Sequence, residues 1–361
     1  MIKVGSDFSG VGAFDQSLKR LNIKYETIFS CDWDKYARMT YVENYGEPNY
    51  FPKDVYEREI PKESLDVYMT SPPCQAFSLA GKRKGEDDKR GLLFYNSHEF
   101  IQKNKPRYFI FENVRGLLSD SKGRTFQIWC DMLGGKSVNG NPVLFPREDA
   151  TPYHIIWQVL NAKHYGVPQN RERVFIIGIR DDDDNNFRFP KKKNLTKRLK
   201  DVLEDNVDEK YFLTDNALKS IIYNKDNLQK SKVNPDIANA LQTPGHSCGV
   251  YKGMNAVSVN SANKKGYEIA TDQDSINFSV PNSETRRGRV GKEVAQTLDT
   301  ACNQAILKNK KIRRLTPREC FRLMDFPEDF KWSVSDTQAY KQAGNSIVVN
   351  VLYEIIKKLN I

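Results

Sequence analysis

The sequence predicts an α/β fold built on a doubly wound parallel sheet, joined to a second, smaller and irregular domain. Two observations predict it. Short apolar runs alternate with helix-like segments up to about residue 180, and a polar stretch then follows to about residue 311. Strands that alternate with helices are typical of a parallel sheet that is covered on both faces.

The first elements follow one another in strand–helix order. We expect strands at residues 2–8 and 25–31, followed by helices at 15–21 and 34–44. Each strand is a short apolar run, and each helix shows apolar residues at three- and four-residue spacing. Four further apolar runs complete the predicted sheet, at residues 66–70, 108–111, 153–160 and 173–180.

The character of the chain changes after residue 180. An acidic run at 181–184 and a basic run at 191–193 lead into sequence that is rich in Asn, Ser, Gln and Lys. This sequence keeps scattered aromatic residues, which favours an irregular domain over disorder. We therefore expect one domain from residues 1–185 and 312–361, and a second from 186–311.

Helical pattern returns near residue 314. Thr316 is expected as the N-cap of a helix, with Pro317 at its first position and Glu319 completing a capping box. An amphipathic helix at residues 346–359 is expected to close the first domain.

Composition limits the classes of function. The chain has 361 residues, and its 56 Lys and Arg outnumber its 46 Asp and Glu, giving a formal charge of +10. Such an excess favours a polyanionic partner, although many basic proteins bind no nucleic acid. The six cysteines contain no Cys-x-x-Cys pair and the four histidines are scattered, so neither a zinc site nor a disulfide framework is expected.

The sequence also gives an expectation about location. No apolar run is long enough to span a bilayer, and the first strand begins at residue 2, leaving no room for a signal peptide. Reduced cysteines fit the cytosol best. We expect a cytoplasmic monomer that holds no metal.

A cysteine stands in the most informative segment of the chain, residues 71–78 (SPPCQAFS). Cys74 follows the expected strand at 66–70, and ligands of open α/β sheets bind beyond the carboxyl ends of such strands. The two prolines stiffen the turn and remove two backbone donors. A rigidly held thiolate is a strong nucleophile, whereas a lone cysteine is more often a buried structural residue.

Three further segments offer groups that could bind a nucleoside. Residues 8–12 (FSGVG) form a glycine turn before a helix, which could accept an anionic group, but such turns are as often structural. Asp32 could accept hydrogen bonds from a ribose diol, and Trp33 offers a face for adenine. Asp54 could accept from an adenine amino group. A helix cap, a packed aromatic and a turn aspartate are the ordinary alternatives.

Charged residues end or begin two of the expected strands. Glu112 follows the strand at 108–111 and could exchange a proton with a ring nitrogen. Arg171 and Arg173 occupy alternate positions where the strand at 173–180 begins, and they could bind a phosphate or a carbonyl group. A cluster of ions at the edge of a strand is the alternative.

Together these segments resemble the cytosine-C5 DNA methyltransferases, prokaryotic enzymes of the restriction–modification type. The resemblance covers residues 1 to about 180 and 312–361, and departs from the pattern at Ala13, where a glycine is frequent, and at Asp7, where an apolar residue is commoner. The segment from about 185 to 311 matches no block of the pattern, as expected for the family's variable target recognition domain. The matching blocks, in the family's order, are residues 8–12, 32–33, 73–75, 112–114, 169–173, 314–320 and 342–346.

The resemblance implies a Rossmann-like domain dependent on S-adenosylmethionine and a role for each matching residue. Cys74 would attack C6 of a cytosine, and Glu112 would hydrogen-bond or protonate N3. Arg171, with Arg173 as the second choice, would hold the base and the thiolate. The C5 atom would then accept the methyl group, and Cys74 would leave after a base removes the C5 proton. The implied cofactor residues are Phe8, Gly10, Gly12, Asp32, Trp33, Asp54, Val55, Pro73, Leu93, Asn345 and Ser346.

The implied partner is double-stranded DNA with a specific target site. The cytosine must be flipped out of the helix, because its C5 atom cannot be reached inside a duplex. The charged stretch at 81–91 resembles the mobile loop of the family, with glycine hinges and lysines for phosphates, although a solvated charge run is the ordinary alternative. The implied DNA contacts are Gln75, Ser78, Lys82, Arg83, Lys84 and Thr297.

Three other functions stay open at this point. A tRNA cytosine methyltransferase has the same fold, but its second domain is reduced and differently patterned. A catalytically silent DNA-binding module would not need Cys74, Glu112 and Arg171 together. A nicotinamide oxidoreductase is weakened by the glycine pattern at residues 8–12, which is not Gly-x-Gly-x-x-Gly.

Overall fold

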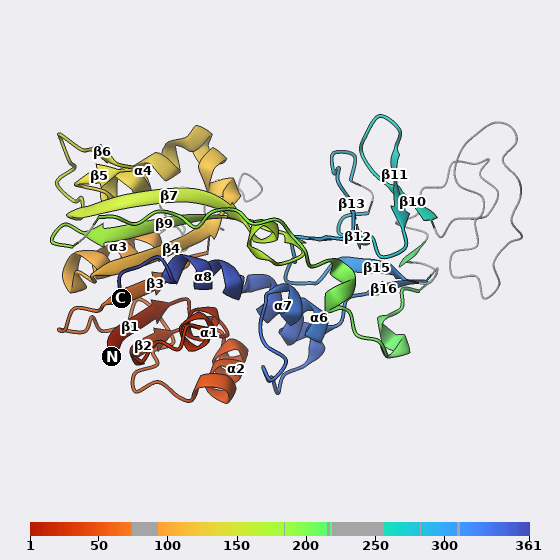
Figure 1. Cartoon of the computed structure of the whole chain (residues 1–361), viewed down its shortest axis with the longest axis horizontal. Coiled ribbons are helices and arrows are strands. Elements are labelled where there is room, and N and C mark those ends of the chain that lie inside the picture. The colour runs from red at the N-terminus through yellow and green to blue at the C-terminus, as the bar shows by residue number, and fades with distance from the viewer. Residues whose placement is uncertain (74–92, 184, 215–216, 219–255, 282, 309–310) are drawn as a thin grey trace, which may run out of the picture.

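The computed structural model describes residues 1–73, 93–183, 185–214, 217–218, 256–281, 283–308 and 311–361. Its largest element is an eight-stranded sheet in the order β2-β1-β3-β4-β9-β7-β5-β6, at the left of Figure 1. The sheet is mixed, because β2, β1, β3 and β4 are parallel while β9 is antiparallel to both β4 and β7. Its strands are β1 (Ile2–Asp7), β2 (Tyr25–Cys31), β3 (Val67–Thr70), β4 (Tyr108–Val114), β5 (Ser137–Val138), β6 (Asn141–Pro142), β7 (Tyr153–Asn161) and β9 (Glu172–Arg180).

The prediction of an all-parallel sheet is therefore wrong for β9. The connection from β7 to β9 holds only the short helix η3 (Ala162–Tyr165) and the two-residue strand β8 (Gln169–Asn170). A parallel crossover needs about a dozen residues or more and usually a full helix, so a connection this short returns the chain antiparallel. The parallel half of the sheet agrees with the strand–helix alternation that predicted it.

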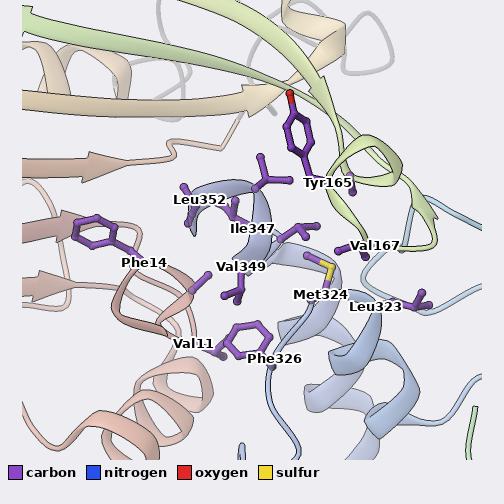
Figure 2. Packing of buried hydrophobic residues seen from close by; sticks show 14 of the residues in the cluster. Val11, Phe14, Tyr165, Val167, Leu323, Met324, Phe326, Ile347, Val349 and Leu352 are labelled. Atoms are coloured by element: carbon purple, nitrogen blue, oxygen red, sulfur yellow. The ribbon is translucent and has the colours of Figure 1, made fainter. Parts of the chain in front are cut away.

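Helices cover both faces of the sheet because side chains alternate along each strand. Val67 and Met69 of β3 face a core that is shared with α1 (Ala13–Arg20) and α8 (Val349–Ile356). Tyr68 faces the opposite core, which is shared with α3 (Leu93–Asn104) and α4 (Arg124–Leu133). Figure 2 shows part of the first core, where Phe14, Val349 and Leu352 lie among residues from the end of the chain.

The remaining helices surround this sheet. Glycine at position 12 is required where α1 begins, because an added Cβ would lie 2.2 Å from the ring of Tyr45 on the next helix. Asp34 caps that helix, α2, through the backbone N–H groups of residues 36 and 37. The bounds of α2 and the later elements are α2 (Lys35–Tyr45), η2 (Arg115–Gly123), η4 (Leu199–Val202), η5 (Glu209–Tyr211), α6 (Pro317–Leu323) and α7 (Asp336–Asn345).

A second group of strands lies at the right of Figure 1 and has its own small core. Two strands pair as β10-β11, and four form a sheet in the order β13-β12-β15-β16, while β14 pairs with β8 of the first part. Val259, Ala270, Ile276 and Leu307 are among the buried residues of this core. The strands are β10 (Ala256–Asn260), β11 (Tyr267–Thr271), β12 (Ser275–Asn277), β13 (Val290–Gly291), β14 (Ala295–Gln296), β15 (Gln304–Lys308) and β16 (Lys311–Arg314).

The expected domain division stays a prediction, and two observations bear on its boundaries. Phe187, Leu199 and Val202 fall after the first boundary at residue 185, yet they pack in the core beneath the large sheet. The second boundary, between residues 311 and 312, falls inside β16, which belongs to the second group of strands.

Candidate active site

The candidate residues gather at the carboxyl ends of the parallel strands, where open α/β sheets bind their ligands. Phe8 follows β1, Asp32 follows β2, and Glu112 lies near the carboxyl end of β4. The order β2-β1-β3-β4 places these ends along one edge of the sheet. The sequence separates them by more than 100 residues, and the sheet brings them together.

The loop after β1 has an unusual backbone conformation. Phe8, Gly10 and Gly12 all have positive φ, at 58°, 56° and 83°. An added Cβ on Gly10 would meet no atom within 4 Å, so the loop faces open space at this point. No side chain caps the N-terminus of α1, which leaves its first backbone N–H groups available to an anionic group.

Asp32 links the ends of β1 and β2. Its carboxylate accepts a hydrogen bond from the backbone N–H of Gly10 at 2.7 Å and another from that of Asp34 at 2.9 Å. Burial raises the pKa of Asp32, and these two backbone hydrogen bonds oppose the rise. The neighbouring Trp33 is 82% exposed, so its ring offers a free apolar face beside the carboxylate. A carboxylate and an open aromatic face next to a glycine turn fit a nucleoside with a ribose diol.

The other expected cofactor residues divide by their surroundings. Phe8, Val55 and Leu93 share the second core, so they lie on one side of the sheet edge. Asp54 is exposed and accepts a hydrogen bond from the backbone N–H of Tyr56 at 3.0 Å, which forms a tight turn. Pro73 is exposed at the end of a described segment.

Asn345 and Ser346 end α7. Asn345 is exposed and Ser346 is buried. The backbone carbonyl of Ser346 accepts a hydrogen bond from Arg171 Nη2 at 2.8 Å. This bond links the last candidate cofactor segment to Arg171, just before β9.

Glu112 and Arg173 form a buried ion pair. Arg173 Nε lies 3.0 Å from Glu112 Oε1, and β4 and β9 place them through the pairing of Glu112 with Phe175 and of Val114 with Arg173. Burial raises the pKa of Glu112, against the opposing charges of Arg173 and Arg171. A carboxyl group with a raised pKa stays protonated over a wider pH range, which suits a proton donor to a ring nitrogen.

Arg171 is buried, and its guanidinium group donates hydrogen bonds to backbone carbonyls. Its Nη atoms donate to the carbonyls of Leu298 at 3.0 Å, Gly344 at 2.9 Å and Ser346 at 2.8 Å. Burial and the nearby Arg173 lower its pKa well below the usual value for arginine. The buried Nε atom has no hydrogen-bond partner. Arg171 therefore ties three chain segments together behind the ion pair.

Several expected residues lie outside the described residues: Cys74, Gln75, Ser78, Lys82, Arg83 and Lys84. The segment that leads to the cysteine is nevertheless fixed in place up to residue 73. Asn113, next to Glu112 on β4, donates from Nδ2 to the carbonyl of Pro72 at 3.0 Å. This bond connects the strand that carries the carboxyl group with the chain two residues before Cys74.

A pocket of about 420 Å³ opens between the large sheet and the second group of strands. Thr297 lies in its wall and donates from its hydroxyl to the carbonyl of Asn170 at 2.8 Å. The pocket therefore has one wall that carries Arg173 and an opposite wall from the second group of strands. Its lining residues are Val114, Arg115, Gly116, Asn170, Glu172, Arg173, Asn277, Arg286, Arg287, Gly288, Gln296 and Thr297.

Two amide side chains join separate chain segments in this region, and neither had a role predicted from the sequence. Asn113 holds the segment before Cys74, and Gln169 donates to the carbonyl of Leu323 at 2.7 Å while accepting from the backbone N–H of Leu298 at 3.2 Å. Both lie in segments that the motifs had singled out. Their roles depend on backbone carbonyls far away in sequence, so the motifs alone could not reveal them.

The described part of the chain contains no group of three or more His, Cys, Asp or Glu side chains that could hold a metal ion. None of its helices combines the length and the apolar character needed to cross a membrane.

Comparison with known proteins gives consistent results. A model of the family described as C-5 cytosine-specific DNA methylase matches residues 2–360. The chain is 33% identical to the Type II methyltransferase M.SsoII of Shigella sonnei, over 98% of this chain and 78% of that protein. It is 32% identical to the Type II methyltransferase M.HpaII of Haemophilus parainfluenzae, over 98% and 87% of the two chains.

Solved structures share the fold. A crystal structure of a Spodoptera frugiperda DNMT2 mutant superposes with a TM-score of 0.63 and 20% identity, over 99% of both chains. A putative DNA modification methyltransferase encoded within an E. coli prophage gives a TM-score of 0.62 at 20% identity, over 99% of this chain and 98% of that chain.

Proposed function

Because the chain belongs to the C-5 cytosine-specific DNA methylase family, we propose that it methylates C5 of a flipped-out cytosine at a specific site in duplex DNA. The observation that carries the proposal is the Glu112–Arg173 ion pair, whose arginine lines a pocket between the two parts of the chain. A flipped base needs such a pocket, and ring chemistry needs an acid and a cation close to the base.

Glu112 is proposed as the group that hydrogen-bonds or protonates N3 of the cytosine. Its burial raises its pKa, which favours the protonated form that N3 requires. A proton at N3 withdraws electrons from C6, so negative charge does not build up on the ring when a thiolate adds there. The ion pair with Arg173 keeps the carboxyl group in one orientation.

The contacts support different roles for the two arginines. Arg173 touches Glu112 and lines the pocket, so we propose that Arg173 holds the base. Arg171 donates to three backbone carbonyls, and we propose that it positions the segments around the site. The resemblance alone had favoured Arg171 for contact with the base.

Cys74 is proposed as the nucleophile that adds to C6. The bond from Asn113 to the carbonyl of Pro72 anchors the chain immediately before Cys74 to the strand that carries Glu112. The addition converts C5 into an enamine-like carbon that can accept a methyl group. Loss of the C5 proton to a base then allows Cys74 to leave and the ring to regain its aromaticity.

S-Adenosylmethionine is proposed as the cofactor, and it supplies an electrophilic methyl group when it is bound. The open space above Gly10, the carboxylate of Asp32 and the exposed ring of Trp33 fit its adenosyl group. Asp54 and Val55 are proposed to contact the adenine, and Phe8, Pro73 and Leu93 to line the same site. Gly12, Asn345 and Ser346 complete the proposed site.

The second group of strands is proposed as the target recognition domain, within the predicted range 186–311. It supplies Arg286 and Arg287 to the pocket, opposite Arg173, and arginines can contact both phosphates and base edges. Thr297 bridges this wall to Asn170. The lysines and polar residues between Gln75 and Lys84 are proposed as further DNA contacts.

The named relatives support a place in a restriction–modification system, because both are Type II methyltransferases. A tRNA methyltransferase and a silent DNA-binding module are not favoured by these relatives. The DNMT2 structure does not change this preference, because at 20% identity it supports the fold alone.

Methyl transfer to DNA tests the proposal directly. The full-length chain is incubated with tritium-labelled S-adenosylmethionine and either duplex DNA or tRNA, and bisulfite sequencing then locates the product. We expect 5-methylcytosine in DNA at one short recurring sequence. The Glu112→Gln variant should bind the same DNA but transfer methyl groups about 100-fold more slowly or worse. Methylation of tRNA instead of DNA would contradict the proposed substrate.

A further inference from the structure

A long irregular segment carries two of the proposed cofactor residues. Residues 46–66 connect α2 to β3 without any helix or strand, and they include Asp54 and Val55. The backbone hydrogen bonds that join this segment to the sheet lie toward its ends, at residues 50 and 65–66. Between these points its position depends on side chains that reach across to the sheet and helices.

One such anchor is a fully buried ion pair. Arg58 Nε donates to Asp7 Oδ1 at 3.0 Å, and the two side chains are 2% and 0% exposed. The other carboxylate oxygen, Oδ2, accepts from the hydroxyl of Tyr68 at 2.6 Å. The guanidinium group of Arg58 also lies over the ring of Phe100 at 4.5 Å. Both carboxylate oxygens of Asp7 thus accept hydrogen bonds from protein side chains.

The pair joins two parts of the proposed cofactor site. Asp7 is the last residue of β1 and directly precedes Phe8, whose φ of 58° begins the glycine turn. Arg58 lies three residues after Val55 in the irregular segment. The ion pair therefore connects the segment that holds Asp54 and Val55 to the residue that precedes the turn at 8–12.

A second arginine holds the beginning of the same segment. Arg38 of α2 donates to the carbonyls of Phe51 at 2.8 Å and Pro52 at 2.9 Å, and its guanidinium group stacks on the ring of Phe51 at 3.6 Å. The turn at Asp54 thus lies between two anchored points. The Arg38 contacts go to the backbone, while the anchor after the turn depends on the Asp7 side chain.

We propose that the buried Asp7–Arg58 pair positions the Asp54–Val55 turn and thereby sets the affinity for the adenosyl group of the cofactor without touching it. This inference rests on the proposed function, which places the cofactor at this turn. A directional ion pair fixes orientation, whereas apolar packing of the same volume would fill the space without fixing it. The two side chains are positioning residues for the cofactor, not contacts to it.

Calorimetric titration of the full-length chain with S-adenosylhomocysteine tests the inference. Arg58→Met leaves the Asp7 carboxylate buried without its cation and should lower the melting temperature. The Asp7→Leu/Arg58→Met double variant removes both charges and should recover most of that loss, because an apolar pair can replace a buried ion pair. We expect the double variant to bind S-adenosylhomocysteine at least tenfold more weakly than the wild type, with unchanged affinity for DNA.

A matched control separates positioning from stability. Arg313 forms another buried pair, with Glu319, at 2.6 Å and with exposures of 4% and 0%, and neither residue belongs to the proposed cofactor site. Arg313→Met should lower the melting temperature as Arg58→Met does and leave S-adenosylhomocysteine binding unchanged. If Arg58→Met does not fold, the double variant decides alone.

Two results would overturn the inference. The first is a double variant that binds within twofold of the wild type, which would make the pair a packing feature only. The second is an Arg313→Met variant that loses as much affinity as the Asp7 and Arg58 variants. A wild-type chain that binds no S-adenosylhomocysteine would instead refute the proposed cofactor itself, and the inference with it, before any substitution is compared.

Discussion

Asp15 is a buried carboxyl group in the first turn of α1, directly behind the glycine turn. Its Oδ1 accepts a hydrogen bond from the hydroxyl of Tyr41 at 2.8 Å, and its Oδ2 has no hydrogen-bond partner. Burial raises its pKa to about 6. The hydrogen bond joins α1 to α2, and burial disfavours the charged form of the Asp15 side chain.

This shift predicts how stability changes with pH. Between about pH 4 and pH 6 the folded chain binds more protons at Asp15 than the unfolded chain does, so this group's contribution to the free energy of unfolding falls as pH rises. Asp15→Asn removes the titration and should raise the free energy of unfolding at pH 7.5 by on the order of 2 kcal/mol, with little gain at pH 4. Urea denaturation at both pH values measures this.

An exposed carboxylate provides the control. Arg147 lowers the pKa of Asp149 through a hydrogen bond, so Asp149→Asn should have a small effect of opposite sign that is lost as pH falls. An Asp15→Asn variant whose gain is equal at pH 4 and pH 7.5 would contradict the buried-carboxylate interpretation.

The residues of the site show how far the sequence could predict it. Motif spacing selected Glu112, Arg171 and Arg173. In the structure Arg173 lines the pocket and pairs with Glu112, while Arg171 donates to backbone carbonyls. Spacing could not tell which arginine meets the carboxyl group, because that depends on the register in which β4 pairs with β9. It also could not assign Asn113, whose acceptor is a backbone carbonyl 41 residues away.

At the scale of single elements, α6 is the helix whose start the sequence described most fully. Thr316 accepts from the backbone N–H of Glu319 at 3.2 Å, Glu319 accepts from that of Thr316 at 2.9 Å, and Pro317 occupies the first position. The predicted capping box is confirmed. Glu319 also pairs with Arg313 of β16, so this helix start is joined to the second group of strands.

Removing the cap should therefore weaken the chain measurably. Thr316→Ala should lower the free energy of unfolding by about 1 kcal/mol, because the backbone N–H of Glu319 loses its acceptor. Thr337→Ala, at an exposed position within α7, is the matched control and should change stability by less than about 0.5 kcal/mol. Chemical denaturation compares the two, and equal losses would show that the cap contributes nothing specific.

Other elements were harder to predict, for physical reasons. The antiparallel β9 follows from a connection too short for a crossover helix, which becomes clear only when η3 and β8 are seen to occupy it. The predicted helix at 346–359 is shorter in the structure, where α8 covers Val349–Ile356. The preceding helix α7 ends with Gly344 and Asn345, which are poor helix formers, so the sequence pattern did not predict this helix.

At the scale of the whole molecule, the part with the large sheet and the second group of strands meet at one pocket. The large sheet has a core on each face, and the second group of strands has a small core of its own. The pocket wall from the second group of strands contains Arg286, Arg287 and Thr297. This division suggests that chemistry belongs to the first part and choice of DNA site to the second.

Transfer of the second part into a relative tests this assignment of roles. Residues 215–300, part of which lie outside the described residues, would replace the corresponding segment of M.HpaII. Because this segment supplies the second wall of the pocket, the hybrid should methylate the site of the present chain, as read by bisulfite sequencing. M.HpaII carrying its own segment is the control, and retention of its original site by a folded, active hybrid would contradict the assignment.

The central claim is that Cys74 forms a covalent bond to the cytosine during methyl transfer, and trapping that bond tests it most directly. Fluorine at C5 cannot leave as a cation, so a duplex with 5-fluorocytosine at the target position should stall with the Cys74–C6 bond intact. The measurement is denaturing electrophoresis of full-length chain with this duplex, with and without S-adenosylmethionine.

The account predicts a protein–DNA band that needs S-adenosylmethionine, survives denaturation and disappears in Cys74→Ser, while Cys74→Ser still binds the duplex through its phosphate contacts. A band that persists in Cys74→Ser, or no band from wild-type chain that methylates ordinary DNA at the same site, would contradict it.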